Sequence, residues 1–288
     1  MHLAFRPLTA VRSLGLGLLF LALLSLASAQ PAPAPDLAKN PAPTRAPLNP
    51  ALPTLFVAGD STAARGKGES QQGWAVPLSN YFDLTKINVA NRARGGRSSR
   101  TYVTEGLWDQ ILADLKAGDY VIIQFGHNDG SPVNEDESVP PAARRARGSI
   151  PGLGEETREI DNIITKKHEV IHTFGWYLRK MIAETKAKGA TPIVLSLTIR
   201  NEWKDGKIER TSRYSKWSAE TAAASGVTFF DLSAAVADKL DALGAEKTAA
   251  LYPQDHTHFN AAGADLHAAT AVAGLKAIPA LGVAKFLK

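Results

Sequence analysis

Five short apolar runs recur between residue 54 and the end of the chain. They are residues 55–58, Ile87–Ala90, Tyr120–Phe125, Pro192–Leu197 and Val227–Phe230. A strand covered on both faces reads as continuous apolar sequence, whereas a half-exposed strand alternates apolar with polar positions. Each run therefore predicts a buried strand.

Amphipathic stretches with helical periodicity lie between these runs. The clearest are Lys167–Lys188, Arg213–Ala224, Ser233–Leu243 and Ala261–Ala277. Strands that alternate with helices imply βαβ units with right-handed crossovers, and hence a parallel sheet with helices on both faces. The pattern predicts an α/β fold, a three-layer α/β/α sandwich of flavodoxin-like type around a five-stranded, mostly parallel sheet.

The first 53 residues follow a different pattern. Arg6 and Arg12 precede the apolar run Leu14–Ala27, and Ala27-Ser28-Ala29 has the small residues of a signal-peptidase site, so residues 1–29 are expected to be a signal peptide. An uncleaved membrane anchor is the alternative, although the run is short for a span. Residues 30–53 are rich in proline and alanine and predict an extended tether. Residues 54–288 then form one domain.

Composition and charge narrow the class of protein. The chain has no cysteine, so disulfides cannot stabilise it and its N-terminus cannot be lipidated on a cysteine. Loss of two arginines with the signal peptide takes the net charge from +5 to about +3, far from the footprint of a nucleic-acid-binding protein. We therefore expect an exported protein, periplasmic or secreted. We expect it to be a monomer with no nucleic-acid partner and no membrane attachment after signal cleavage.

Small polar residues follow the first predicted strand. The strand ends in Gly59-Asp60-Ser61, and the carboxyl ends of parallel strands line the crevice where ligands bind in an open α/β sheet. Gly59 permits a sharp turn there. For the tripeptide alone, an ordinary strand-to-helix turn with Asp60 or Ser61 as N-cap is the alternative.

The other strand-end loops contain groups that complement a serine. Gly96 leaves a backbone N–H open to close approach, and Asn128 offers a neutral side-chain donor. Asp255 precedes His258 by three residues, so its carboxylate can fix the tautomer of the imidazole. A serine nucleophile needs a base, the base needs an orienting acceptor, and the oxyanion needs N–H donors. These are the parts of a serine hydrolase site, without the G-x-S-x-G motif of α/β-hydrolases.

In order and spacing, these blocks resemble those of the GDSL-like or SGNH hydrolases. The blocks are Gly59-Asp60-Ser61, Gly96, Gly126-His127-Asn128-Asp129 and Asp255-His256-Thr257-His258. The longer strings around them are more narrowly similar to rhamnogalacturonan acetylesterases, and the likeness runs from about Thr54 to the last helix. The resemblance implies an SGNH-hydrolase fold for residues 54–288. It also implies an esterase that removes O-acetyl groups from a plant cell-wall polysaccharide. Pectic rhamnogalacturonan is the expected substrate.

The resemblance assigns a role to each matching residue. Ser61 would be the nucleophile, and its own N–H would form the oxyanion hole together with the Gly96 N–H and the Asn128 side chain. His258 would be the base, oriented by Asp255. The reaction would pass through an acetyl-serine and would need no metal or organic cofactor. The alternatives are an acetylesterase for another glycan such as xylan or for small acyl esters, and a non-catalytic glycan-binding protein.

Two groups of residues are candidates for binding an acetylated polysaccharide. Arg97 and Arg100 belong to a cluster of arginines beside Gly96, and arginine pairs bidentately with carboxylates such as those of galacturonate. A solvated positive face is the alternative. Trp203 lies in the loop from Arg200 to Arg210, where an aromatic ring could stack on a sugar, although tryptophan in an α/β domain more often belongs to the core.

Two other segments have more than one interpretation. His168-Glu169-Val170-Ile171-His172 matches the H-E-x-x-H motif of zinc proteases and lies in a stretch expected to be helical, but no third-ligand pattern follows it. We expect no metal site. The segment from Ser131 to Glu159 is rich in proline, glycine and charge and predicts an insertion over the rim of the crevice, either a lid or a disordered loop.

Overall fold

Five parallel strands form the central sheet, in the order β2-β1-β3-β6-β9. They are β1 (Thr54–Gly59), β2 (Asn88–Asn91), β3 (Tyr120–Gln124), β6 (Thr191–Leu195) and β9 (Thr228–Phe230). Every residue of β1 and β3 is buried, as continuous apolar runs require. All five predicted strands and their parallel arrangement are confirmed.

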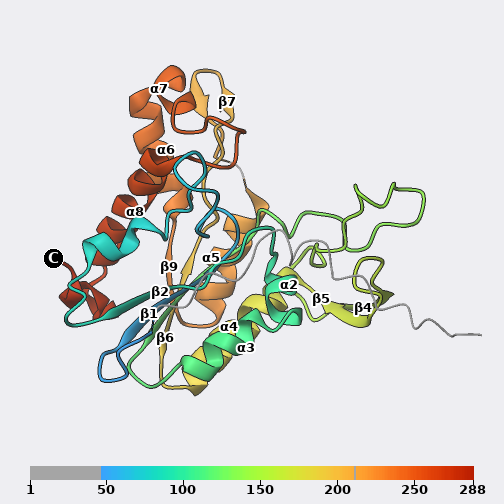
Figure 1. Cartoon of the computed structure of the whole chain (residues 1–288), viewed down its shortest axis with the longest axis horizontal. Coiled ribbons are helices and arrows are strands. Elements are labelled where there is room, and N and C mark those ends of the chain that lie inside the picture. Colours follow the sequence, from blue (N-terminus) through green and yellow to red (C-terminus); the bar gives the residue numbers. More distant parts are fainter. Residues whose placement is uncertain (1–46, 211) are drawn as a thin grey trace, which may run out of the picture.

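The computed structural model describes residues 47–210 and 212–288 (Figure 1). The predicted signal peptide and most of the predicted tether lie outside the described residues. The described end of the tether packs on the domain: Leu48 contacts the apolar layer beneath β1, and the backbone N–H of Asn49 donates to Oδ1 of Asn88 at 3.0 Å. The folded unit therefore begins before residue 54. Among the described helices, none has the length and apolar character needed to cross a bilayer.

Helices cover both faces of the sheet (Figure 1). One face packs on α2 (Ser99–Thr104), α3 (Leu107–Asp114), α4 (Phe174–Ala187) and α5 (Arg213–Ala224). The other packs on η1 (Pro77–Tyr81), α6 (Leu232–Leu243) and α8 (Ala261–Lys276), with α7 (Ala245–Ala249), η2 (Pro279–Leu281) and η3 (Val283–Phe286) beside them. Alternate β1 residues enter the two layers, Leu55 one and Phe56 the other. The three-layer sandwich is confirmed.

Two small hairpins extend from this sandwich. One is formed by β4 (Thr157–Asp161) and β5 (His168–His172), and the other by β7 (Trp203–Lys204) and β8 (Lys207–Ile208). The H-E-x-x-H motif is therefore a strand, and the helix predicted over Lys167–Lys188 is wrong in its first part. Helix α4 begins only at Phe174, where the Thr173 hydroxyl caps it by accepting from the N–H of Trp176 at 3.1 Å.

The strand geometry also separates the two histidines of the motif. Four residues of extended chain span about 13 Å, too far for His168 and His172 to bind one metal ion. His172 stacks on Trp176 instead, with ring centroids 3.7 Å apart. The zinc-protease interpretation of this motif is therefore wrong.

The segment after β3 runs out beside the β4–β5 hairpin and α2 (Figure 1). It is held by the Arg100 guanidinium, which donates to the carbonyl oxygens of Val133 at 2.8 Å and of Gly148 at 2.9 Å. The backbone N–H of Ser149 donates to the carbonyl of Asp129 at 3.2 Å. This segment is thus attached to the carboxyl edge of the sheet at several points, and the disordered alternative is wrong.

Candidate active site

Ser61 lies directly after β1, in a turn that Asp60 holds together. Oδ1 of Asp60 accepts hydrogen bonds from the backbone N–H and from the hydroxyl of Thr62, both at 2.8 Å. The carbonyl of Asp60 also accepts from the N–H of Ala64 at 3.0 Å. Asp60 is fully buried, so the turn that presents Ser61 is fixed from beneath.

A chain of hydrogen bonds links Ser61, His258 and Asp255. Nε2 of His258 lies 2.8 Å from Oγ of Ser61, and Nδ1 of His258 lies 2.7 Å from Oδ2 of Asp255. Oδ1 of Asp255 accepts from the backbone N–H groups of Thr257 and His258, each at 2.7 Å. The structure therefore brings Ser61 to the Asp255–His258 pair, although Ser61 and His258 are 197 positions apart in the sequence.

The carboxylate of Asp255 is stabilised in its charged form. Burial favours the neutral acid, but the hydrogen bonds from the side chain and backbone of His258 and from the backbone of Thr257 outweigh it and lower the pKa of Asp255 to about 2. A charged acceptor at Nδ1 favours the tautomer with the proton on that nitrogen. Nε2 is then free to accept the proton of the Ser61 hydroxyl.

Gly96 and Asn128 lie in loops that contact each other at the same edge. Gly96 has φ +77°, a left-handed conformation that glycine adopts without strain. Asn128 is buried, and its Nδ2 donates to the carbonyl of Arg97 at 3.0 Å. An asparagine amide has two N–H groups, so this bond leaves one for a ligand.

Asp129 ties these loops to the rest of the site, a role that the sequence does not reveal. Its carboxylate accepts from the N–H of Ser99 at 3.1 Å and from the hydroxyl of Ser149 at 2.9 Å, and its side chain is almost fully buried. Burial raises the pKa of Asp129 to about 6, against the lowering effect of the bonds from Ser99 and Ser149. Asp129 thus joins the end of β3 to α2 and to the segment after β3.

The two arginines predicted to bind substrate are structural. Arg100 has no exposed side-chain surface and pairs with Glu169 at 2.6 Å, while Arg97 is 4% exposed and pairs with Glu105 at 2.8 Å. Ser98 caps α2 in a capping box. In the first turn of this helix, Nε of Arg100 donates to Oε2 of Glu169 in β5 at 3.2 Å. Both guanidinium groups are thus engaged inside the protein, which argues against a contact of Arg97 or Arg100 with the substrate.

Trp203 has the contacts of a packing residue. Its indole packs against the apolar layer that contains α6 and α8, and its Nε1–H donates to Oδ1 of Asn201 at 2.7 Å. A contact of Trp203 with a sugar stays a prediction.

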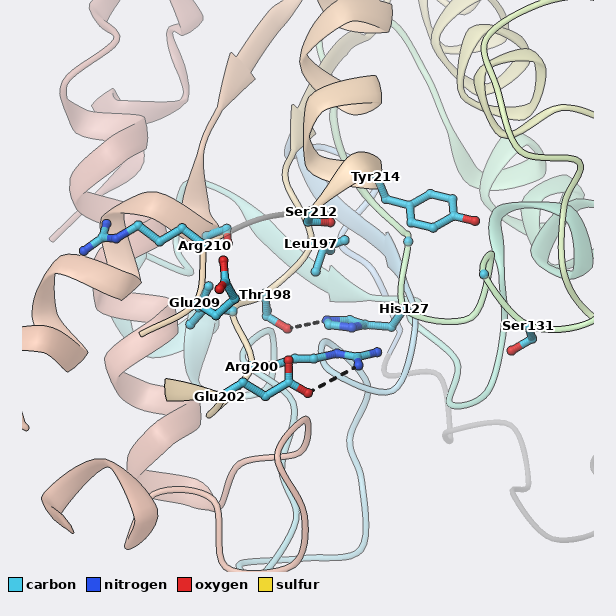
Figure 2. Close-up of a pocket in the computed structure, with 14 residues that line it drawn as sticks. His127, Ser131, Leu197, Thr198, Arg200, Glu202, Glu209, Arg210, Ser212 and Tyr214 are labelled. Carbon is cyan, nitrogen blue, oxygen red and sulfur yellow. Dashed lines mark hydrogen bonds and ion pairs between the residues drawn. The ribbon is translucent and has the colours of Figure 1, made fainter. Parts of the chain in front are cut away.

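A pocket of about 300 Å³ lies at the ends of β3 and β6 (Figure 2). Its lining includes His127, which directly precedes Asn128, together with Arg200 and Tyr214. Nε2 of His127 lies 2.9 Å from Oγ1 of Thr198. Burial lowers the pKa of His127, Asp60 opposes that effect, and Arg200 and His258 add to it. The sequence pointed to the loop from Arg200 to Arg210 as a place for substrate contacts. It gave no individual role to Arg200, and it gave none to His127.

Comparison with known proteins agrees with this geometry. The model of the GDSL-like Lipase/Acylhydrolase family matches residues 57–266. A rhamnogalacturonan acetylesterase of Emericella nidulans is 36% identical over 80% of this chain and 86% of its own length. A probable rhamnogalacturonan acetylesterase of Bacillus subtilis, YesY, is 28% identical over 77% of this chain and 92% of its own.

The crystal structure of the Bacillus subtilis protein YxiM has a similar fold. It superposes with a TM-score of 0.63 at 27% identity, over 79% of this chain. The chain spans 57% of that longer protein. The match thus covers the sandwich described above and leaves a large part of YxiM without a counterpart.

Proposed function

We propose a specific activity for this chain, which belongs to the GDSL-like lipase/acylhydrolase family and is a carboxylic ester hydrolase. It is an exported acetylesterase that acts on plant cell-wall polysaccharide, and pectic rhamnogalacturonan is its main substrate. The observation that carries the proposal is the hydrogen-bonded chain from Ser61 through His258 to Asp255 at the carboxyl edge of the sheet. The named activity of the two relatives supports the choice of substrate.

The geometry supports a two-step acetyl transfer. In the first step, Oγ of Ser61 attacks the carbonyl carbon of the acetyl ester while Nε2 of His258 takes the serine proton. The N–H groups of Ser61 and Gly96 and the free N–H of Asn128 are the donors proposed for the oxyanion. The bond between the acetyl carbon and the sugar oxygen then breaks, and His258 returns its proton to that oxygen.

The second step hydrolyses the acetyl-serine. Water attacks the acetyl carbon, His258 takes the water proton, and acetate leaves as the proton returns to Oγ of Ser61. Asp255 stays ionised throughout, because its pKa of about 2 is far below any working pH.

Acetate release by wild type and two variants tests this function. The substrates are acetylated rhamnogalacturonan and acetylated xylan, measured side by side. Ser61→Ala is expected to abolish release, and Asn128→Ala to lower kcat by about a hundred- to a thousandfold because one oxyanion donor is lost. Circular dichroism and thermal unfolding serve as controls for folding. Release by Ser61→Ala equal to that of wild type would contradict the serine mechanism, and near-normal activity of Asn128→Ala would remove Asn128 from the oxyanion hole.

The comparison of substrates also separates the proposed function from its alternative. Release from xylan alone would keep the serine mechanism and discard the pectic substrate. Export is a second part of the proposal, since it rests on the sequence of residues 1–29. Mass spectrometry of protein recovered outside the cytoplasm is expected to find a mature chain that begins at Gln30.

A further inference from the structure

The pocket at the ends of β3 and β6 has no part in the acetyl transfer just described. It is joined to the active site at two points. His127 directly precedes Asn128, and the backbone N–H of Asn201 donates to the carbonyl of His256 at 2.7 Å, two residues before His258. A polymer whose acetyl group lies at Ser61 can therefore place a neighbouring part of the same chain in the pocket.

Two arginines line the pocket, and they differ in their partners. Arg210 pairs with Asp238 at 2.7 Å and Asp241 at 2.5 Å, and Figure 2 shows its side chain pointing away from His127. Arg200 is 40% exposed, and its guanidinium lies beside His127. Within residues 47–210 and 212–288, Arg200 has one carboxylate partner, Glu202 at 3.8 Å, which is too far for a hydrogen bond.

The groups around Arg200 leave its charge available to a ligand. Oε1 of Glu202 also lies 3.5 Å from Nε2 of His256, so this carboxylate has a second cationic partner when that imidazole is protonated. Glu209 lines the same pocket and adds a negative charge. Burial lowers the pKa of His127, which favours its neutral form, and its Nε2 is engaged with Thr198. An anion entering the pocket is thus attracted by Arg200 and opposed by the two glutamates.

We propose that Arg200 binds a carboxylate of the polymer, so that the pocket is the subsite that selects galacturonate-containing substrate. This inference rests on the proposed function. The planar guanidinium fork matches a carboxylate in a bidentate arrangement, which a neutral sugar cannot reproduce. The pocket thereby takes the role that the sequence suggested for Arg97 and Arg100.

Three substrates separate this role from catalysis. They are acetylated rhamnogalacturonan, the same polymer with its carboxyl groups reduced to alcohols, and p-nitrophenyl acetate. Arg200→Gln is expected to lower kcat/KM on the native polymer by about ten- to a hundredfold, mainly through KM, because a charged hydrogen bond is lost. Its kcat/KM on the reduced polymer and on p-nitrophenyl acetate should not change. Arg158→Gln, at an exposed position in β4, is the matched control and should behave as wild type on all three.

Glu202→Gln supplies a variant with the opposite expected effect. Removing this charge frees Arg200 and lessens repulsion, so kcat/KM on the native polymer should rise several-fold without change on p-nitrophenyl acetate. Equal losses by Arg200→Gln on all three substrates, or no loss on the native polymer, would overturn the inference. A wild type that prefers neither the native nor the reduced polymer would also overturn it, while leaving the acetylesterase proposal intact. A wild type that hydrolyses p-nitrophenyl acetate but releases acetate from neither polymer would overturn the polysaccharide function, and the inference with it.

Discussion

Asp129 has a structural role although it is next in the chain to Asn128, a proposed oxyanion donor. The carboxylate is buried between Ser99 and Ser149. Hydrogen bonds from three donor groups, the N–H and hydroxyl of Ser99 and the hydroxyl of Ser149, do not fully replace its hydration. The pKa of Asp129 is therefore raised to about 6, and the residue lies next to Asn128 in the chain. This coupling makes the stability of the loop that positions Asn128 dependent on pH.

We predict that Asp129 destabilises the fold as pH rises. The unfolded chain ionises at the ordinary value of 3.8, whereas the folded chain holds its proton to about 6, so stability is highest at low pH and is lost between these values. Relative to Asp129→Asn, wild type should lose ~2.5 kcal/mol of unfolding free energy between pH 4 and pH 7.5. Urea denaturation of both proteins at the two pH values measures this, with Asp109→Asn, exposed in α3, as control. A difference that does not change with pH would contradict the prediction.

Some helices and strands follow from the local pattern of apolar and polar residues, whereas others depend on contacts between residues far apart in the sequence. The five sheet strands follow from apolar runs, and the helix predicted over Arg213–Ala224 has the bounds of α5. The β4–β5 hairpin could not be predicted, because the pairing of Glu169 with Arg100 joins residues 69 positions apart. The same contact explains why Arg100 was mistaken for a surface residue. Ser61, Asn128, Asp255 and His258 could be identified because each belongs to a short motif, whereas the pocket around Arg200 depends on the packing of loops.

We predict that the Arg100–Glu169 pair is essential to the stability of the hairpin. Arg100 is fully buried, so Glu169→Ala would leave an uncompensated charge in the interior and should lower the unfolding free energy by ~3–5 kcal/mol. Glu159→Gln, in β4 with a side chain that is 74% exposed, should change it by less than ~0.5 kcal/mol. Chemical denaturation of the three proteins provides the comparison. Since His168 and His172 cannot share a metal ion, a chelator should leave all three unfolding curves unchanged, and a shift with chelator would contradict the assignment of this hairpin to structure.

In the whole molecule, the carboxyl and amino ends of the sheet strands have different roles. The carboxyl ends of the strands hold Ser61 and the pocket, whereas the amino ends are covered by the last residues of the chain. Leu287 forms a bridge with Phe82, the N–H of Lys288 donates to the carbonyl of Tyr81 at 3.1 Å, and the ring of Phe286 lies 6.3 Å from that of Tyr120, the first residue of β3. Stability at this end should therefore be separable from catalysis at the other.

Removal of residues 283–288 tests this separation. Val283 is fully buried, and Phe286 and Leu287 pack against the same apolar layer, so their loss should cost ~3–5 kcal/mol. For a domain of this size that corresponds to a fall in Tm of roughly 6–20 °C. At a temperature where the shortened protein remains folded, its kcat/KM on p-nitrophenyl acetate should equal that of the full chain, because the contacts of the deleted segment with Tyr81, Phe82 and Tyr120 lie away from the carboxyl ends of the strands. Removal of Lys288 alone is the control and should leave Tm nearly unchanged. A loss of activity without a loss of folding would show instead that the two ends of the sheet are coupled.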